Sequence, residues 1–199
     1  CSKGAEDREG FEAIEPALAV VAEREGLTLQ ALPLRSVGVK ADLRAYEHPV
    51  LISGEGSWDS LLRVAGTVYK EVPGINRCIW NLGPAAPRAV RVLPATMTRE
   101  RLDLLREADA IVMDGLRRHS IYHEVWQCPT VLLPLELDGR GRELVILRPI
   151  NSERGMTATP YRLPEALLAE LRTALLALPG VSGLALDLTT KPPGTIEWE

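Results

Sequence analysis

The chain has 199 residues, of which 46% are hydrophobic, 25% charged and 5% aromatic, and its formal net charge is −4. These values predict one globular domain or two small ones, and they exclude a disordered chain and a basic protein that wraps nucleic acid. No apolar run approaches the roughly 20 residues that span a bilayer. Three widely spaced cysteines and the polar residues 1–10 argue against a secreted disulfide framework and a signal peptide. We therefore expect a cytoplasmic protein that binds neither nucleic acid nor membranes.

The first half of the chain predicts two helices and three strands. Helical sequence covers 8–25, and residues 58–72 carry apolar side chains at steps of three and one, the one-sided stripe of an amphipathic helix. Pro73-Gly74 ends this second helix, because proline cannot continue it and glycine accepts a left-handed turn. Three extended, largely apolar stretches are predicted strands: 32–39, 48–53 and 75–82.

The second half, which follows a proline- and alanine-rich linker at 83–95, repeats this order. Adding 106 to the apolar positions of the helix 58–72 gives a matching stripe from Pro164 to Leu178, and Pro179-Gly180 ends it in the same way. Both halves therefore have the order α-β-β-α-β, with one extra short helix in the second. The predicted elements of the second half are helices over 98–118, 120–127 and 164–178 and strands over 130–137, 142–147 and 181–188.

These patterns predict an α+β fold made by tandem duplication of one α-β-β-α-β unit, each copy a small three-stranded sheet with helices on one face. The first two strands are joined by eight residues in the first copy and by four in the second, too few for the crossover helix of a parallel doubly wound sheet. The linker sets the boundary, which gives a first subdomain over 1–84 and a second over 85–199. A unit of under ~100 residues buries limited apolar surface alone, so the two copies are expected to pack on each other.

Sequence motifs for a self-contained catalytic site are missing, including phosphate loops, dinucleotide-binding glycines and a nucleophile elbow. His119 and His123 are four residues apart on one helical face with Cys128 nearby, which is an acceptable zinc spacing. A structural zinc site normally needs four ligands, however, and no second cluster accompanies these residues. We therefore predict no metal site and no catalytic residue. Basic side chains within 99–118 alternate with acids and indicate a solvated helix face.

Two segments call for more than a packing explanation. The first is RSVGVKADLRAY at 35–46, in which Arg35, Lys40 and Arg44 surround Asp42. Such a loop could hold a phosphorylated ligand, or it could be an exposed hairpin whose ion pairs contribute little. The second is KPPGTIEWE at 191–199, where two prolines stiffen the backbone and a tryptophan can anchor it. Chain ends are normally frayed, so an anchored end suggests that Lys191, Thr195 or Glu197 is placed for a purpose.

The same segments resemble the C-terminal region of GMP synthetase, the glutamine-hydrolysing ligase that aminates xanthosine monophosphate (XMP). The family ends in K-P-P-[AG]-T-x-E-W-E, which residues 191–199 match throughout, and its string R-S-V-G-V-x-x-D-x-R-x-Y matches 35–46 at every specified position. The resemblance runs from about residue 30 to the end. Further matches are LLREADAI at 104–111, WQCPTVLLPL at 126–135 and LRPINSERGMTA at 147–158.

The resemblance implies an XMP site. Family residues that contact XMP correspond to Asp42, Gln127, Lys191 and Glu197, and neighbouring residues of the same motifs with a supporting role are Arg35, Arg44, Thr195 and Ile196. Here the R-S-V-G-V string lies in the first copy and the tail in the second, as in long family members with two related subdomains. The two copies would then have to pack together to complete the site.

The resemblance also implies what must lie elsewhere. The family needs a glutaminase and an ATP pyrophosphatase with a Ser-Gly-Gly-x-Asp-Ser phosphate loop, and neither is recognisable in this sequence. ATP and Mg²⁺ are therefore expected at a separate pyrophosphatase domain or subunit, and no cofactor is expected on this chain alone. A first residue Cys1 instead of methionine favours a truncated chain.

Three functions remain open at this point. The first is the substrate-binding and dimerisation part of GMP synthase, which positions XMP for ATP-dependent amination to GMP in purine biosynthesis. The second is a non-catalytic interaction module with a vestigial nucleotide site. A stand-alone enzyme is the third, and no nucleophile paired with a base supports it. The sequence also leaves open whether the duplication replaces a homodimer or adds to one.

Overall fold

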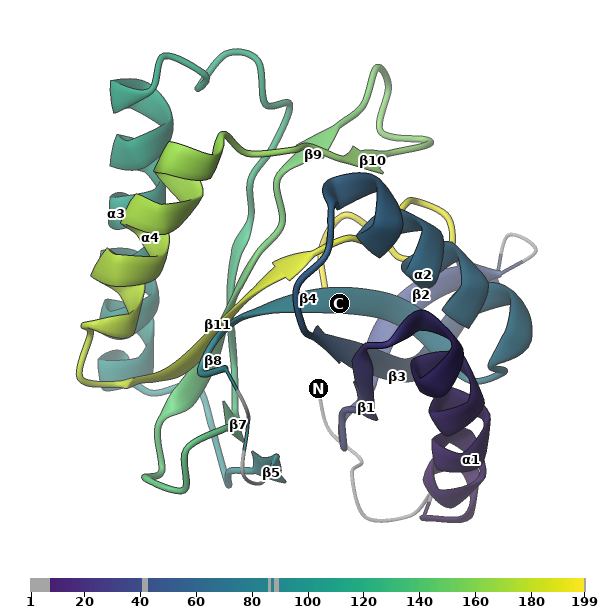
Figure 1. Cartoon of the computed structure of the whole chain (residues 1–199). Coiled ribbons are helices and arrows are strands. Elements are labelled where there is room, and N and C mark those ends of the chain that lie inside the picture. The colour runs from purple at the N-terminus through teal and green to yellow at the C-terminus, as the bar shows by residue number, and fades with distance from the viewer. Residues whose placement is uncertain (1–7, 41–42, 86, 88–89, 199) are drawn as a thin grey trace. The chain divides into compact units, whose positions relative to one another are not determined.

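The computed structural model of the chain describes residues 8–40, 43–85, 87 and 90–198 (Figure 1). It confirms the predicted α+β class, with four helices and strands that pair in both directions. The chain forms two compact units. Unit 1 contains the residues up to Asn81 together with 152–159 and 187–199, and unit 2 contains 82–151 and 160–186. No helix in the described part of the chain is long and apolar enough to cross a membrane.

Unit 1 is built on the long strand β3. The helices and strands are α1 (Arg8–Glu25), β1 (Thr28–Ala31), β2 (Ser36–Lys40), β3 (Leu43–Ser53), α2 (Trp58–Glu71) and β4 (Ile75–Gly83). The second half of β3 pairs antiparallel with β1 and parallel with β4, and its first half pairs antiparallel with β2. Helix α1 packs against β1 and against α2.

The strand predicted over 32–39 is wrong in its boundaries. Two strands, β1 and β2, replace it, and they are separated by residues 32–35. Pro33 interrupts the ladder because it has no N–H to donate, and the N–H of Leu34 turns back to the carbonyl of Leu32 at 2.8 Å. The described residues up to Asn81 therefore contribute to four strands, β1 to β4, instead of the predicted three.

Helix α2 forms where its apolar stripe predicts it. Ser57 caps the helix, because its hydroxyl accepts a hydrogen bond from the N–H of Ser60 at 3.2 Å. Asp59 in the first turn and Lys70 in the last turn both complement the helix dipole. The buried face of α2 consists of Leu61, Val64, Ala65 and Val68.

Unit 2 contains the remaining elements. They are β5 (Arg91–Val92), α3 (Arg99–Arg118), β6 (Thr130–Leu133), β7 (Leu135–Glu136), β8 (Glu143–Leu147), β9 (Ile150–Asn151), β10 (Thr159–Pro160), α4 (Glu165–Leu176) and β11 (Val181–Asp187). The boundary between the units falls within β4, after Asn81, within β10, after Thr159, and within β11, before Asp187. Strand β8 pairs antiparallel with β6 and parallel with β11. Helix α3 packs against α4 and β6. The strand directions in β6-β8-β11 are thus the same as in β1-β3-β4.

The short helix predicted over 120–127 is wrong. Ser120 has a φ of +60°, outside the range of a right-handed helix, so α3 ends there. Residues 121–125 form a turn in which the N–H of Glu124 bonds the carbonyl of Ile121 at 3.0 Å. The N–H of Trp126 then bonds the carbonyl of Ile150 at 3.0 Å. This long-range pairing satisfies the backbone without a helix.

The last residues of the chain lie in unit 1. The predicted second subdomain, 85–199, includes them, whereas the compact units join 152–159 and 187–199 to the first part of the chain. Long-range backbone pairing accounts for this: the N–H of Val39 on β2 donates to the carbonyl of Pro193 at 2.7 Å. The KPPGTIEWE segment at the end of the chain thus folds against β2, which belongs to the other sequence motif, RSVGVKADLRAY at 35–46.

Candidate functional site

Residues 191–198, which we call the tail, form the candidate site together with β2. Gly38 on β2 and Gly194 in the tail form an antiparallel bridge. Farther along, the N–H of Val37 donates to the carbonyl of Trp198 at 3.5 Å. Glycine is required at position 38, because a Cβ there would lie 2.5 Å from the carbonyl oxygen of Pro193. The R-S-V-G-V motif therefore supplies a backbone edge for the tail.

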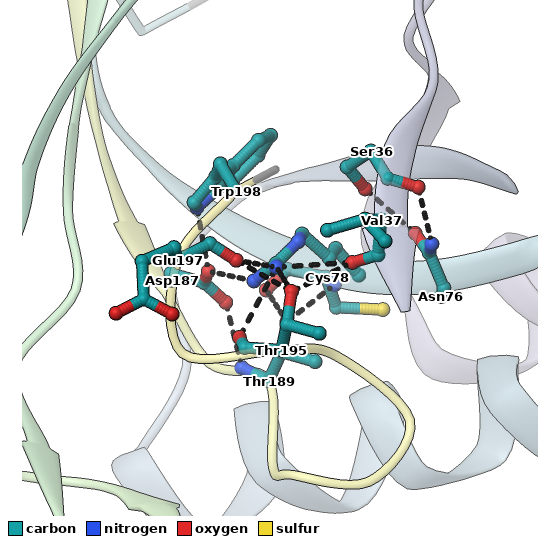
Figure 2. Close-up of polar contacts among 10 residues, drawn as sticks. Ser36, Val37, Asn76, Cys78, Asp187, Thr189, Thr195, Glu197 and Trp198 are labelled. Atoms are coloured by element: carbon teal, nitrogen blue, oxygen red, sulfur yellow. Dashed lines mark hydrogen bonds and ion pairs between the residues drawn. The ribbon is translucent and has the colours of Figure 1, made fainter. Parts of the chain in front are cut away.

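Strand β2 is itself tied to β4 by side chains. Ser36 and Asn76 are buried and exchange two hydrogen bonds: the Ser36 hydroxyl donates to Asn76 Oδ1, and Asn76 Nδ2 donates to the Ser36 carbonyl, each at 2.7 Å. Figure 2 shows this pair beside Val37. Because buried polar groups must be satisfied, the exchange fixes the position of β2 against β4.

A buried ion pair lies beneath the tail. Arg77 on β4 and Asp187 at the end of β11 are both 0% exposed, and Arg77 Nη1 donates to Asp187 Oδ2 at 3.1 Å. Arg77 Nη2 donates to the carbonyls of Val37 at 3.1 Å, Thr195 at 3.1 Å and Glu197 at 2.6 Å. It also donates to the Thr195 hydroxyl at 2.8 Å. The guanidinium therefore binds β2 and the tail at once.

Trp198 is the anchor that its position predicts. Its side chain is 4% exposed, and its indole N–H donates to Asp187 Oδ2 at 3.0 Å. The Arg77 guanidinium carbon lies 4.7 Å from the centre of the Trp198 ring, in cation–π contact. Ile196 is 6% exposed and is also buried. Burial on both sides of Glu197 fixes its backbone.

Glu197 has an exposed side chain on this fixed backbone. Its carbonyl accepts hydrogen bonds from Arg77 Nη2 and from the Thr195 hydroxyl, the latter at 2.5 Å. In Figure 2 its carboxylate points away from this network, while the carbonyl faces it. The geometry leaves both carboxylate oxygens available to accept hydrogen bonds from a ligand.

Lys191 begins the tail and contacts the loop 152–157. Its backbone exchanges two hydrogen bonds with Ala158, at 2.8 and 3.1 Å, and its ammonium donates to the carbonyl of Gly155 at 2.5 Å. The Ser152 hydroxyl closes the loop, since it accepts from the N–H of Gly155 at 2.8 Å and donates to the carbonyl of Thr157 at 2.7 Å. The loop thus holds the lysine while two of its three N–H donors remain for other partners.

The other predicted site residues are distributed over the chain. Arg35 is half-buried just before β2, and Arg44 is exposed on β3. Asp42 lies outside the described residues. Unit 1 therefore contains the described residues Arg35, Arg44, Lys191, Thr195, Ile196 and Glu197 of the predicted set.

Gln127 lies in unit 2 and is exposed. Its carbonyl accepts from the N–H of Ile150 at 2.9 Å, which leaves the side-chain amide to other partners. It lines an open pocket of about 460 Å³ with an aromatic rim. The other lining residues are Met113, Leu116, Tyr122, His123, Val125, Trp126 and Cys128.

The candidate zinc ligands do not form a cluster. His119 Nε2 contacts the Glu170 carboxylate at 3.0 Å, and Arg118 also pairs with this carboxylate. Cys128 is buried, and burial raises the pKa of its thiol to about 12. Within the described part of the chain, no group of three or more His, Cys, Asp or Glu side chains could hold a metal ion.

Arg77 and Asp187 were missed by the sequence analysis. Each is the one charged residue of its predicted strand, INRCIWNL at 75–82 and VSGLALDL at 181–188. Charged side chains are almost never fully buried unless they are paired. The two charged residues were therefore a usable signal of a buried ion pair, although the sequence does not show which other residues this pair binds.

Comparison with known proteins agrees with the motifs. The family model described as "GMP synthase C terminal domain" matches residues 114–198. A probable glutamine-hydrolysing GMP synthase of Leptospira interrogans is 35% identical over 187 residues, which cover 88% of this chain and 30% of that protein. GMP synthases of Leifsonia xyli and Roseobacter denitrificans are 45% and 42% identical over 124 and 123 residues, which cover 58% of this chain and 24% and 23% of those proteins. The chain spans less than a third of the length of these relatives, and the matches identify it as similar to the C-terminal region of GMP synthases.

Proposed function

We propose that this chain is the XMP-recognition and dimerisation part of a GMP synthase, and that it positions XMP for ATP-dependent amination to GMP with glutamine as the nitrogen donor. One observation carries the proposal. The tail, which matches the family signature, is fixed by the buried Arg77 network, while the carboxylate of Glu197 is exposed. A segment that is fixed by its backbone and displays a polar side chain is suited to bind a ligand without further ordering.

The predicted residues supply complementary chemistry for a nucleotide. The Lys191 ammonium suits a phosphate as a point charge. Carboxylates such as Glu197 and Asp42 accept hydrogen bonds from hydroxyls or from the N–H groups of an oxidised purine, and the Gln127 amide can both donate and accept. Arg35 and Arg44 add positive charge near the R-S-V-G-V motif. The contribution to catalysis would be proximity and orientation instead of acid–base chemistry.

The reaction itself would be performed by other domains. The chain covers less than a third of its relatives, which are glutamine-hydrolysing GMP synthases. We expect ATP and Mg²⁺ to bind an ATP-pyrophosphatase domain or subunit, and glutamine to bind a glutaminase. Alone, this chain should bind XMP without converting it.

We also propose that the chain arose by tandem duplication of one unit. An offset of 106 takes Trp58, where α2 begins, to Pro164, which caps α4, and Ile75, where β4 begins, to Val181, where β11 begins. In both units a strand, β3 or β8, pairs antiparallel with an earlier strand, β1 or β6, and parallel with a later one, β4 or β11. The Leptospira relative aligns with 88% of the chain and the other two with 58%, as expected if these two lack one copy.

Calorimetric titration of XMP into the chain, with and without an ATP-pyrophosphatase domain, tests the proposal. Lys191→Ala should weaken binding by about tenfold or more, or about 1.4 kcal/mol, because a charge-assisted contact to phosphate is lost. Lys70→Ala is the matched control, since Lys70 is an exposed lysine in the last turn of α2. Absence of XMP binding in both titrations, or equal effects of the two substitutions, would contradict the proposal.

The second candidate function is an interaction module with a vestigial nucleotide site. The bond between the Lys191 ammonium and Gly155 favours it, because this donor is already used within the chain. Such a module would self-associate or bind a pyrophosphatase domain with no measurable affinity for XMP. Sedimentation velocity distinguishes a homodimer from a monomer in which the two copies within one chain take the place of the two subunits.

A further inference from the structure

Most of the described hydrogen bonds that the Arg77–Asp187 pair makes to other residues go to the tail. The four acceptors of Arg77 Nη2 include three atoms of the tail, namely the Thr195 carbonyl, the Thr195 hydroxyl and the Glu197 carbonyl. Asp187 Oδ2 accepts from the indole of Trp198, and Asp187 Oδ1 accepts from the N–H of Thr189 at 2.9 Å. Nearly every described hydrogen bond of the pair is thus directed to residues 189–198.

Burying this pair has a high cost unless its hydrogen bonds are made. Removing a carboxylate and a guanidinium from water carries an effective penalty of several kcal/mol per ion, and good geometry with additional hydrogen bonds is needed to offset it. The bonds to Thr195, Glu197 and Trp198 exist only while the tail lies in its observed place. Burial of the charges therefore makes the position of the tail specific, because any displacement of residues 195–198 leaves a buried charge with fewer partners.

Under the proposed repeat, the positions equivalent to Arg77 and Asp187 do not form a second Arg–Asp pair. Adding 106 to Arg77 gives Gly183, and adding 106 to Asn81 gives Asp187. One copy thus supplies the arginine and the other the acid, while the reciprocal positions hold a glycine and an amide. No side chain fits at Gly183, since a Cβ there would lie 2.5 Å from Leu137 Cδ1 and 2.9 Å from the carbonyl oxygen of Gly83.

We infer that Arg77 is a positioning residue: paired with Asp187, it holds residues 195–197 so that the Glu197 carboxylate is presented to the nucleotide, and each chain has one such arrangement. Arg77 itself does not contact the ligand, because it is fully buried under the tail. The role in presenting XMP rests on the proposed function. The holding of the tail does not, so the two can be tested separately.

Amide hydrogen exchange in the complete chain tests the holding of the tail. Arg77→Lys keeps the charge but replaces the planar fork by a single ammonium, which cannot reach Asp187, Val37 and the tail together. Exchange in peptides that cover 193–198 should rise about tenfold or more, with α3 and α4 unchanged. Arg101→Lys is the matched control: Arg101 donates two hydrogen bonds to Glu143 in unit 2, at 2.7 and 3.1 Å, and its loss should leave tail exchange unchanged.

Trp198→Phe is a second variant for the case that Arg77→Lys does not fold. It keeps an aromatic ring over the guanidinium and removes the indole N–H that donates to Asp187, so a smaller rise in tail exchange is expected. Unchanged tail exchange in Trp198→Phe, or in Arg77→Lys where that variant folds, would overturn the positioning role. Equal rises in Arg77→Lys and Arg101→Lys would also overturn it, since the effect would then be general destabilisation.

XMP titration tests the consequence for the ligand. Wild type should bind one XMP per chain, and Arg77→Lys should bind it about tenfold more weakly or worse. Two sites per chain, or unchanged affinity in a variant whose tail exchanges faster, would overturn the inference. If wild type binds no XMP even with a pyrophosphatase domain, the proposed function fails, and the exchange experiment still decides whether Arg77 holds the tail.

Discussion

Gly38→Ala is a one-carbon test of how closely the tail approaches β2. The added Cβ would lie 2.5 Å from the carbonyl oxygen of Pro193 and 3.0 Å from both Cβ and Nδ2 of Asn76. Ordinary contact for a Cβ begins at 3.4 Å, so the Pro193 carbonyl must move away by about 0.9 Å. The neighbouring bond from the Val39 N–H to that carbonyl, now 2.7 Å long, would approach 3.6 Å and be lost.

Two costs add up in this variant. Overpacking costs about 1–3 kcal/mol, and the lost hydrogen bond about 1 kcal/mol, so Gly38→Ala should reduce the free energy of unfolding by about 2–4 kcal/mol. Gly66→Ala is the matched control. Gly66 lies within α2, and nothing lies within 4 Å of its added Cβ, so alanine should stabilise the protein by about 0.5–1 kcal/mol through its better helix propensity.

Urea denaturation followed by far-ultraviolet circular dichroism measures both changes. The two variants should shift the midpoint in opposite directions, and hydrogen exchange should accelerate in the tail of Gly38→Ala alone. XMP affinity should fall with it under the proposed function. If Gly38→Ala is as stable as wild type with unchanged tail exchange, the tail does not approach β2 as described.

Three further predictions concern other parts of the chain. Ser57→Ala should destabilise the protein by about 1 kcal/mol in urea denaturation, because the cap on Ser60 N–H is lost; no loss would contradict the capping role. Burial raises the pKa of the Cys78 and Cys128 thiols, so both should resist iodoacetamide at pH 8 until urea is added, as peptide mass spectrometry would show. These thiols keep their protons in the folded state and ionise more readily in the unfolded chain. Their contribution to the free energy of unfolding should therefore be fully present below about pH 8.5 and decline above it. Labelling of the thiols in the native protein by iodoacetamide would refute this prediction. Hydrogen bonds from His119 and then Arg118 lower the pKa of Glu170, so His119→Asn should raise that pKa in a carboxylate NMR titration, and an unchanged value would remove His119 as the main cause.

The elements that the sequence predicts well are those with a one-sided apolar stripe. The stripe of 58–72 and the helical sequence of 98–118 became α2 and α3 within one residue at each end, because burial of one face fixes both the period and the length of a helix. The break at 32–35 and the turn at 121–125 were missed. The break has a local signal in Pro33 that the prediction did not use, whereas the turn depends on the bond from Trp126 to the distant Ile150, which no local pattern encodes.

The candidate site was predictable in composition but not in assembly. Motif resemblance names Lys191 and Glu197 as candidates, which stays a prediction, whereas the predicted anchoring of Trp198 is confirmed by its burial. Local sequence patterns do not show which part of the chain the tail packs against. The Thr195 hydroxyl lies 3.0 Å from the Val37 carbonyl, although the two residues are 158 positions apart in the sequence. Buried partners at such distances are set by the whole fold, so a motif names the residues of a site before it can show their arrangement.

Under the proposed duplication, the cost of burying charge accounts for one Arg–Asp pair, and so for one site that holds the tail. An arginine buried without its carboxylate costs about 3–5 kcal/mol, so an Arg–Asp pair persists or disappears as a unit. At the reciprocal positions the chain has Asn81, whose amide donates to the Ser53 hydroxyl at 3.1 Å, and Gly183, packed against Leu137. Restoring a second pair would need Asn81→Asp and Gly183→Arg together, and the second change has no room. Under the proposed duplication, the Arg77–Asp187 pair therefore takes one residue from each copy, and the reciprocal positions hold an amide and a glycine.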